Sequence, residues 1–462
     1  MNNDVDADVI VLGAGISGLA SAWEIQQQGA LVIVLEAGLQ AGGCIATARE
    51  QGCLLESGPN SALETNPLIA PLLETLGISG ERIPASPRSI NRYIVRQGRL
   101  HALPLSPFAL LTSSLFSARA KLRLLREPFI SRASPDAEES VADFVRRRLG
   151  DEFLDYAINP FVGGVYAGDP QRLSVGAAFP RLHALEQRYG SLIRGQLRGA
   201  MARKRDPEKS RQSAPMFAFR EGMQTLTDAM AQRLASIELG TKVTNITGGR
   251  EGYAVEATGA DGRRRYRARA VVVAVPAWVA TTLVASMAPA AAAALGAIPY
   301  PPVTVIHSAY RRDRIAHPLD GFGMLVPGRE GLRTLGTLFS STMFANRAPP
   351  GMALLTTFIG GARQPALAQL DEREIAAIAQ AEQASLLGAA AAPEWVRVTR
   401  WAQAIPQYNM GHAARISTLE QTEHALPGLV FCANYRGGVS IGDCIKSANR
   451  SARDVMAFLQ RR

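Results

Sequence analysis

Residues 8–37 read DVIVLGAGISGLASAWEIQQQGALVIVLEA. The apolar run at 9–12, the turn GAGISG and the periodic run at 19–28 predict a strand followed by a helix. Gly29 ends that helix, and the apolar run at 31–35 predicts a second strand. A strand–helix–strand unit with GxGxxG in its first turn is typical of a dinucleotide-binding α/β domain. We therefore expect a parallel sheet whose first turn faces a dinucleotide.

Each glycine of this turn has a task of its own. Gly13 permits the tight turn, Gly15 lets a pyrophosphate approach the backbone, and Gly18 allows the helix to pack closely on the strand. The helix N-terminus favours phosphate charge. Glu36 ends the second strand, where a carboxylate can bind ribose hydroxyls. The predicted contacts with the dinucleotide are Gly13, Ala14, Gly15, Ile16, Ser17, Gly18, Glu36 and Ala37.

Two further glycine-containing segments narrow the choice of dinucleotide. They are EAGLQAGGCIATA, with Gly42 and Gly43, and LLESGPNS, with Gly58. With the first turn, this arrangement resembles the flavoproteins with two dinucleotide-binding domains, a superfamily of amine oxidases, phytoene desaturases and protoporphyrinogen oxidases. Amine oxidases often carry Arg after the glycine pair, whereas this chain has Cys44, which fits the protoporphyrinogen oxidases better. FAD is therefore the expected cofactor.

The same resemblance continues along nearly the whole chain. The segments that carry it are NRYIVRQG (91–98), NPFVGGVYAGDPQRLSV (159–175), FREGMQTL (219–226), GFGMLVP (321–327), TLGTLFSSTMF (334–344), TTFIGGARQP (356–365) and FCANYRGGVSIGDCI (431–445). Each is similar to a segment of the oxygen-dependent protoporphyrinogen oxidases, especially the plant and bacterial members. The resemblance implies oxidation of protoporphyrinogen IX to protoporphyrin IX in haem biosynthesis. It implies three FAD-mediated two-electron steps, with O2 as acceptor and H2O2 as product.

The resemblance also implies roles for residues of the substrate site. Arg96 matches the family arginine that pairs with a propionate of the substrate. Phe358 matches the aromatic residue that stacks on one pyrrole ring, and Leu325 and Leu338 match the pair that sandwiches another. Gly164 would let the backbone pass close to the ligand. Without the resemblance, Arg96 reads as an exposed strand residue and the others as core.

No catalytic residue is certain, because a hydride can pass directly from the substrate to flavin N5. Asn60 matches a family asparagine near the flavin and the substrate. The remaining cofactor contacts implied by the resemblance are Gly42, Gly43, Gly58, Pro59, Asn60, Ser61, Val243, Trp401, Val439, Ser440 and Ile441. No cysteine lies where monoamine oxidases attach their flavin, so we expect non-covalent FAD.

The late segment GGVSIGDCI (437–445) predicts a second helix start at the cofactor. A helix N-terminus there would stabilise the negative charge that reduction places on the flavin ring. Asp443 has two interpretations: it caps the helix, or its charge opposes the reduced flavin.

Composition and charge indicate the number of domains, the cellular compartment and the kinds of ligand to expect. The chain has 462 residues, 47% of them hydrophobic and 19% charged, which indicates two or three domains with a large core. Its four cysteines form no CxxC pair and no zinc-like spacing, so we expect no metal and a reducing, cytoplasmic compartment. The net charge of +10 is clustered at 146–148, 203–211 and 263–269. We interpret these runs as solvated faces, or alternatively as attraction to anionic lipid or substrate; no nucleic-acid motif accompanies them.

The expected fold is α/β, with a discontinuous FAD-binding domain at 1–88, 215–297 and 396–462. A β-rich substrate domain is expected at 89–105 and 298–395, with a hairpin closed at Gly98. A helical insert at 106–214 would contact a membrane peripherally through SPFALLTSSLFSARAKLRLLREPF, or else bury these side chains or form a homodimer. Prolines interrupt the uncharged stretch 270–309, which therefore reads as strand, helix and strand rather than a membrane span. Hand-off of the product to the next haem-pathway enzyme is a further expected interaction.

Other functions stay open on the sequence alone. Coproporphyrinogen III oxidation to coproporphyrin III keeps the chemistry but brings four propionates, so extra cations at the site would favour it. A flavin amine oxidase or carotenoid desaturase is a different enzyme class, and Cys44 and the Arg96 motif argue against it. The escort proteins of prenylated GTPases share this fold without using flavin, but intact glycine turns and Glu36 argue against that function.

Overall fold

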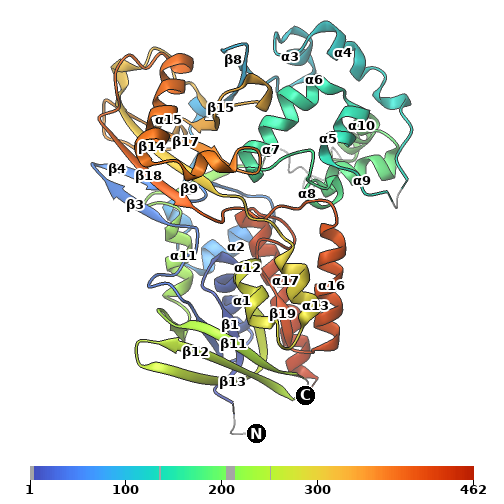
Figure 1. The fold of residues 1–462 in the computed structure, drawn as a ribbon, viewed down its shortest axis with the longest axis vertical. Helices are drawn as coiled ribbons and strands as arrows, with labels where there is room; N and C mark the ends of the chain where they lie inside the picture. The colour runs from blue at the N-terminus through green and yellow to red at the C-terminus, as the bar shows by residue number, and fades with distance from the viewer. Residues whose placement is uncertain (1–4, 135–136, 204–213, 250, 462) are drawn as a thin grey trace.

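The computed structural model describes residues 5–134, 137–203, 214–249 and 251–461. Figure 1 shows three parts. A sheet flanked by helices makes up the lower half, a second sheet lies at the upper left, and short helices gather at the upper right. The chain enters the lower part first and also ends there.

The central sheet has seven strands in the order β10-β2-β1-β13-β12-β11, with β19 also paired to β13. Strands β10, β2, β1, β13 and β19 are parallel, whereas β12 and β11 join antiparallel. The predicted first unit is confirmed as β1, α1 (Ile16–Gln27) and β2. The strand bounds are β1 (Ala7–Leu12), β2 (Val32–Leu35), β10 (Ile237–Glu238), β11 (Lys242–Gly249), β12 (Gly252–Gly259), β13 (Gly262–Val273) and β19 (Leu429–Phe431).

Alternating side chains of β1 build a core on each face of this sheet. Val9 and Val11 pack with α1, α11 (Gln224–Ala231) and α17 (Ile441–Gln460). Ile10 and Leu12 pack with α12 (Ala277–Val284), α13 (Pro289–Gly296) and α16 (His412–Ala425). The uncharged stretch 270–309 thus becomes the end of β13, two helices and most of β14, where one helix between two strands was predicted. Among the described residues, no helix is long and apolar enough to cross a membrane.

The second sheet has the order β18-β14-β17-β16-β15-β7-β8. Strands β7 and β8 form the predicted hairpin. Helix α15 (Glu372–Leu387) covers one face, where Ile375 and Ile378 pack on Ile306 and Ile359. The other bounds are β7 (Asn91–Arg96), β8 (Arg99–Ala102), β14 (Val303–Arg311), β15 (Gly321–Leu325), β16 (Thr334–Leu338), β17 (Met352–Gly360) and β18 (Trp395–Trp401).

One expected boundary does not coincide with the edge of an element. We placed the last segment of the FAD-binding domain from residue 396 onward, but β18 pairs with β14 along its whole length. Residues 396–401 therefore belong to the second sheet. The sequence did not indicate that this strand belongs to the second sheet, because β18 is an edge strand whose polar residues face solvent on one side.

Between β8 and residue 203, all elements of the described residues (103–134 and 137–203) are helical. They are α3 (Pro107–Thr112), α4 (Ala118–Leu124), η3 (Glu127–Phe129), α5 (Val141–Arg148), α6 (Asp151–Phe153), η4 (Leu154–Ile158), α7 (Asn159–Tyr166), α8 (Val175–Ala178), α9 (Pro180–Tyr189) and α10 (Leu192–Arg203). Their positions agree with the helical character expected for 106–214. Residues 204–213, with most of the expected basic run 203–211, lie outside the described residues.

Small elements connect these parts. Strand β9 (Met216–Phe219) returns from the helices and pairs with β5 (Ala62–Leu63) and β6 (Arg82–Pro84). Strands β3 (Thr47–Glu50) and β4 (Cys53–Glu56) form a hairpin between the two large sheets. The short helices α2 (Ile69–Thr75) and α14 (Ser340–Met343) complete the connections. All four cysteines are free, and the described residues contain no cluster that could hold a metal ion.

Candidate flavin and substrate site

The first glycine turn leaves room where a pyrophosphate would lie. Gly13 has φ +96°, a conformation that favours glycine. A Cβ at Gly18 would overlap the Gly13 carbonyl oxygen, so α1 packs on β1 at a distance only glycine allows. A Cβ at Gly15, in contrast, would meet no atom within 4 Å. The open space in front of Gly15 and the packing at Gly18 both fit a dinucleotide-binding turn.

The Glu36 carboxylate is fixed at the mouth of this turn. It accepts the backbone N–H groups of Ala14 and Gly38, each at 2.7 Å. The Glu36 carbonyl accepts the N–H of Thr241 at 2.7 Å, which brings the start of β11, and with it Val243, to the end of β2. An ordered carboxylate beside a glycine turn fits the adenosine half of FAD.

The two later glycine segments lie against the first turn. Gly42 donates its N–H to the Ala14 carbonyl at 2.8 Å. A Cβ at Gly58 would overlap the Cys44 carbonyl, so the loop 58–61 packs directly behind the Gly42-Gly43 segment. The side-chain N–H of Asn60 donates to the Gly58 carbonyl at 3.2 Å. The structure thus brings together the cofactor contacts predicted from three separate segments.

The late helix start lies at the same edge of the sheet. Strands β1 and β19 both run parallel to β13, and α1 and α17 follow them on the face that carries Val9 and Val11. Helices that follow parallel strands on one face begin at the carboxyl edge of the sheet. The N-termini of α1 and α17 therefore point to one region.

Ser440 caps this helix, and Asp443 in its first turn binds the capping side chain. The Ser440 hydroxyl accepts the N–H of Asp443 at 3.1 Å and donates to the Asp443 carboxylate at 2.6 Å. Asn66 also reaches α17 and donates to the Gly442 carbonyl at 2.7 Å. The expectation that Asp443 is itself the cap is wrong, since Ser440 is the N-cap, but the Asp443 carboxylate belongs to the capping interaction because it accepts the Ser440 hydroxyl.

Tyr408 anchors the late glycine loop and was missed from the sequence. Its hydroxyl accepts the Gly438 N–H at 3.0 Å and donates to the Asn434 carbonyl at 2.6 Å. Its ring stacks on His412 with centroids 4.2 Å apart. Burial lowers the pKa of His412 to about 4, so this pair is uncharged near neutral pH. A tyrosine in an irregular loop carries no sequence pattern that would reveal such a role.

Three of the predicted substrate residues share one face of the second sheet. Leu325 pairs with Gly336, and Gly336 pairs with Phe358, so these residues form a row across three strands. Leu338 lies two positions beyond Gly336, on the same face. All three side chains are half-buried, although most of their strand neighbours are buried. This face lies opposite α15. A Cβ at Gly336, in the middle of the row, would approach the Met324 carbonyl oxygen to 2.5 Å and Leu325 Cδ2 to 3.2 Å, so glycine there allows close packing between the strands.

Gly164 lies against the same row. It belongs to α7, and a Cβ at Gly164 would approach Leu325 Cδ2 to 2.6 Å. Helix α7 thus contacts the sheet at the predicted substrate residue. Gly164 therefore allows α7 to pack directly on the Leu325 side chain.

Arg96 occupies a different position from the other substrate residues. It shares their sheet face, since Ile94, two residues earlier, pairs with Leu325. Its Nη1 donates to the Glu152 carboxylate at 2.6 Å and to the Leu115 carbonyl, and its guanidinium carbon lies 4.5 Å from the centre of the Tyr156 ring. It lines a groove of about 1260 Å³ to which none of Leu325, Leu338 and Phe358 contributes.

Glu152 is a partner of Arg96 that the sequence did not reveal. Burial raises its pKa, but hydrogen bonds from Ser117 and Arg96 outweigh that effect and lower the pKa overall. The pair is therefore ionised near neutral pH. A substrate carboxylate at Arg96 would share the guanidinium with Glu152 and use its remaining N–H groups.

Comparison with known proteins places the chain in a family. Residues 16–456 match the family described as flavin containing amine oxidoreductase. Protoporphyrinogen oxidase 2 of Arabidopsis thaliana is 34% identical over 98% of this chain and 94% of its own. Coproporphyrinogen III oxidase of Bacillus subtilis (strain 168) is 26% identical over 99% of both chains.

Two solved structures share the fold. A protein of Exiguobacterium sp. 255-15, provisionally named protoporphyrinogen oxidase, has a TM-score of 0.81 at 22% identity, with 98% of each chain covered. Cyclohexylamine oxidase from Brevibacterium oxydans IH-35A has a TM-score of 0.71 at 19% identity, covering 99% of this chain and 100% of its own. Together with the sequence relatives and the glycine turns described above, these findings confirm the predicted fold class, cofactor and enzyme class. The chain belongs to the protoporphyrinogen oxidase family of FAD-dependent oxidoreductases.

Proposed function

We propose that this chain oxidises protoporphyrinogen IX to protoporphyrin IX in three two-electron steps, with O2 as the final acceptor and H2O2 as product. The row Leu325–Gly336–Phe358 carries the proposal, because the half-buried, apolar side chains of Leu325 and Phe358 form one surface on the sheet face opposite α15. Such a surface fits a flat, apolar macrocycle. The 34% identity to a plant protoporphyrinogen oxidase supports the same substrate.

FAD, held without a covalent bond, supplies the hydride acceptor when it is bound. The chain's own residues bind and orient the substrate. Phe358 packs on one pyrrole ring, and Leu325 and Leu338 enclose another, with Leu325 held in place by the close approach of Gly164. Asn60, held by the Gly58 carbonyl, positions the substrate. The N-terminus of α17 stabilises negative charge that develops beside it.

The direct test is an aerobic assay of the yellow protein with protoporphyrinogen IX and coproporphyrinogen III in separate reactions, followed by porphyrin fluorescence. We expect turnover of protoporphyrinogen IX with stoichiometric H2O2. A protein that carries FAD but turns over neither compound would refute the proposed function. A colourless protein would instead favour an escort role that does not use flavin.

Coproporphyrinogen III is the second candidate substrate because of one observation. Arg96 shares its groove with Arg119, Arg123, Arg126 and Arg329. Extra cations beside the expected propionate partner suit a substrate with four propionates rather than two. Comparison of kcat/KM for the two porphyrinogens decides between them.

We also propose a cytoplasmic enzyme that contacts the inner face of the cell membrane peripherally. Support comes from exposed apolar side chains on and around α3 and α4, where Phe108 is 76% exposed and Leu122 64%. Exposed apolar residues beside basic ones are typical of interfacial segments. Leu122→Ser should weaken flotation with anionic vesicles. Leu39→Ser is the matched control, since Leu39 is 84% exposed near the glycine turns.

The same surface could instead join two copies of the chain. Light scattering at several protein concentrations distinguishes a homodimer from membrane contact. If the parent protein forms a dimer that Leu122→Ser dissociates, and the parent protein does not bind vesicles, this surface joins two copies of the chain instead of contacting a membrane. Hand-off to the next haem-pathway enzyme stays a prediction.

A further inference from the structure

An arginine-rich groove lies beside the substrate face, between the β7–β8 hairpin and the helices α4 and α6. Its volume is about 1260 Å³, and its walls include Arg96, Leu122, Leu149, Tyr156 and Glu330. Arg119, Arg123 and Arg126 line it from α4 and the turn that follows. These positions are separated by four and three residues, so the three side chains lie on one side of a helical path.

The acidic residues of the groove are already engaged. Glu152 binds Arg96 and Ser117. Glu330 accepts the Tyr156 hydroxyl at 3.1 Å and the Gly98 N–H at 3.4 Å. Asp151 pairs with Arg146 at 3.1 Å, away from the arginines of α4.

The three arginines of α4 and the following turn, in contrast, lack anionic partners. Within the described residues, neither Arg119 nor Arg126 has an acceptor at hydrogen-bond distance. Arg123 donates one N–H to the Arg147 carbonyl, and its Nη1 is buried without any partner. A buried guanidinium nitrogen without an acceptor costs free energy, so the charge of Arg123 is not fully compensated by the fold.

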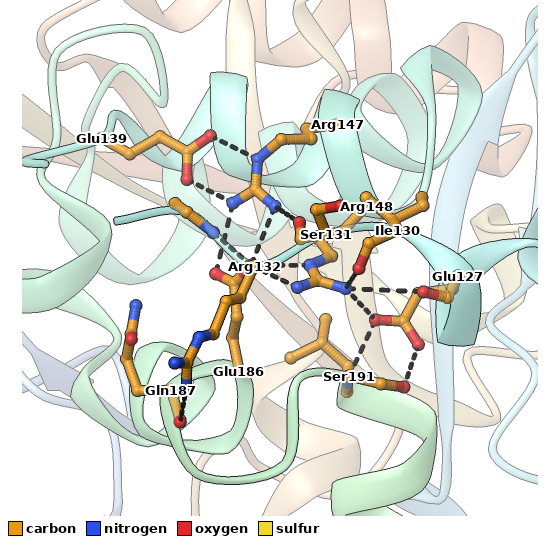
Figure 2. A network of polar contacts seen from close by, with 12 residues as sticks. Glu127, Ile130, Ser131, Arg132, Glu139, Arg147, Arg148, Glu186, Gln187 and Ser191 are labelled. Carbon is orange, nitrogen blue, oxygen red and sulfur yellow. Dashed lines mark hydrogen bonds and ion pairs between the residues drawn. The ribbon is translucent and has the colours of Figure 1, made fainter. Parts of the chain in front are cut away.

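Two other arginines of the same helical part, Arg147 and Arg148, do have carboxylate partners. Figure 2 shows Arg147 and Arg148 surrounded by Glu127, Glu139 and Glu186. Where a cation serves only the fold, the chain supplies its own carboxylates. Arg119, Arg123 and Arg126 have no carboxylate partners and repel one another, and an anionic ligand would relieve that repulsion.

We propose that this groove binds the carboxylates of the tetrapyrrole substrate outside the face formed by Leu325 and Phe358. The inference rests on the proposed function and extends it. Leu122 and Leu149 give the groove apolar walls, and Arg96 links it to the substrate face. A ligand with an apolar body and several carboxylates matches both features. Four propionates would engage more of these cations than two, so the groove favours the substrate with more carboxylates.

The experiment compares Arg119→Ala/Arg126→Ala with the parent enzyme. Both side chains are exposed and bind no other described group, so the fold should be kept. Arg263→Ala/Arg265→Ala removes the same charge from exposed positions of β13 and serves as the control. We expect KM for coproporphyrinogen III to rise about five- to tenfold in the groove variant, and KM for protoporphyrinogen IX to rise less. FAD content and kcat should not change.

Direct binding of coproporphyrin III, followed by its fluorescence at low salt, tests the groove apart from turnover. If the parent enzyme oxidises neither porphyrinogen, the proposed function fails, yet weaker coproporphyrin binding by the groove variant would still support the groove. KM and porphyrin affinity equal to those of the β13 control would overturn the inference. So would a variant that loses only its affinity for anionic vesicles, because the groove would then bind lipid headgroups.

Discussion

The indole N–H of Trp401 donates to the Ser57 carbonyl at 2.8 Å, across 344 residues of sequence. Trp401 ends β18 in the second sheet, and Ser57 precedes the loop 58–61 predicted to contact the flavin. One hydrogen bond therefore fixes the cofactor loop to the sheet that carries the substrate face. We expect this connection to set the position of a bound substrate relative to the cofactor.

Replacing Trp401 with Phe removes the N–H and keeps most of the ring. The lost hydrogen bond should cost about 1 kcal/mol, so FAD should bind roughly fivefold more weakly. Titration of the apoprotein with FAD, followed by flavin fluorescence, measures this. Trp395→Phe, in the same strand, is the control and should leave FAD affinity unchanged. Equal affinities for the two variants would mean that Trp401 contributes packing alone.

The glycines of the first turn should separate cofactor binding from folding. Gly15 has φ −72° and ψ 174°, which alanine can adopt, and a Cβ there meets no protein atom within 4 Å. Gly15→Ala should therefore leave the melting temperature of the apoprotein unchanged and abolish FAD retention. Gly18→Ala should lower that melting temperature, because its Cβ would overlap the Gly13 carbonyl. Full FAD content in Gly15→Ala would show that the open space does not face the cofactor.

Phe358→Ala should affect the substrate more than the fold. Phe358 is half-buried, whereas its strand neighbour Leu355 is fully buried. We expect KM for the porphyrinogen to rise about tenfold in Phe358→Ala, from lost stacking and apolar contact. Leu355→Ala should instead destabilise the protein by about 2–5 kcal/mol and change KM little. Steady-state kinetics should therefore show a raised KM for Phe358→Ala alone, and denaturant unfolding should show a large loss of stability for Leu355→Ala.

The buried ion network of the helical part should control its stability. Arg148 and its partners Glu127 and Glu186 have no exposed side-chain surface. Arg148→Ala leaves Glu127 buried without a cation and removes one of the two arginines that bind Glu186, so it should destabilise this part by about 3–5 kcal/mol. Arg146→Ala, at an exposed pair, should change stability by less than about 1 kcal/mol. Hydrogen exchange of α5 and α9, which resolves local stability, checks both.

The same network predicts a dependence on pH. Burial raises the pKa of Glu186, but hydrogen bonds from Arg147 and Arg148 outweigh it, so the pKa lies below the ordinary 4.5. A carboxyl group with a lowered folded-state pKa stabilises the fold fully above its unfolded value, and loses that effect as pH falls through the folded value. The protection of α9 should therefore decrease below about pH 4.5. Glu186→Gln should show weaker protection at neutral pH and a shallower decrease in acid.

Local patterns predicted the parts of the site that depend on short stretches of chain. The turn GAGISG, the carboxylate at Glu36 and the helix start after Gly438 follow from residue types at fixed spacing. The three substrate residues came from resemblance, and strand register then placed them in one row. Arg146, Arg147 and Arg148 were interpreted as a solvated run, and this was wrong for Arg148, which is buried. Its partners come from other helices, and adjacent basic residues give no sign of them.

The pairs Arg96–Glu152 and Trp401–Ser57 could not be predicted for the same reason. Each joins residues far apart in the chain, and neither partner has a local pattern that indicates the other. The groove beside Arg96 likewise arises only when α4 and α6 meet the β7–β8 hairpin. Sequence spacing predicted where the chain can bind phosphate, whereas tertiary packing decided where its unpaired cations lie.

The packing of α1 against α17 has a consequence for synthesis of the protein. The first helix is among the earliest segments made, and its partner begins at Ile441. Contacts between residues so far apart form late and slow the folding of a chain. During translation the apolar face of α1 that packs on α17 must therefore stay uncovered until residues 441–460 have been made. Nascent chains that stop before α17 should be targets for chaperones and proteases, and cofactor loading should not begin before α17 has been made.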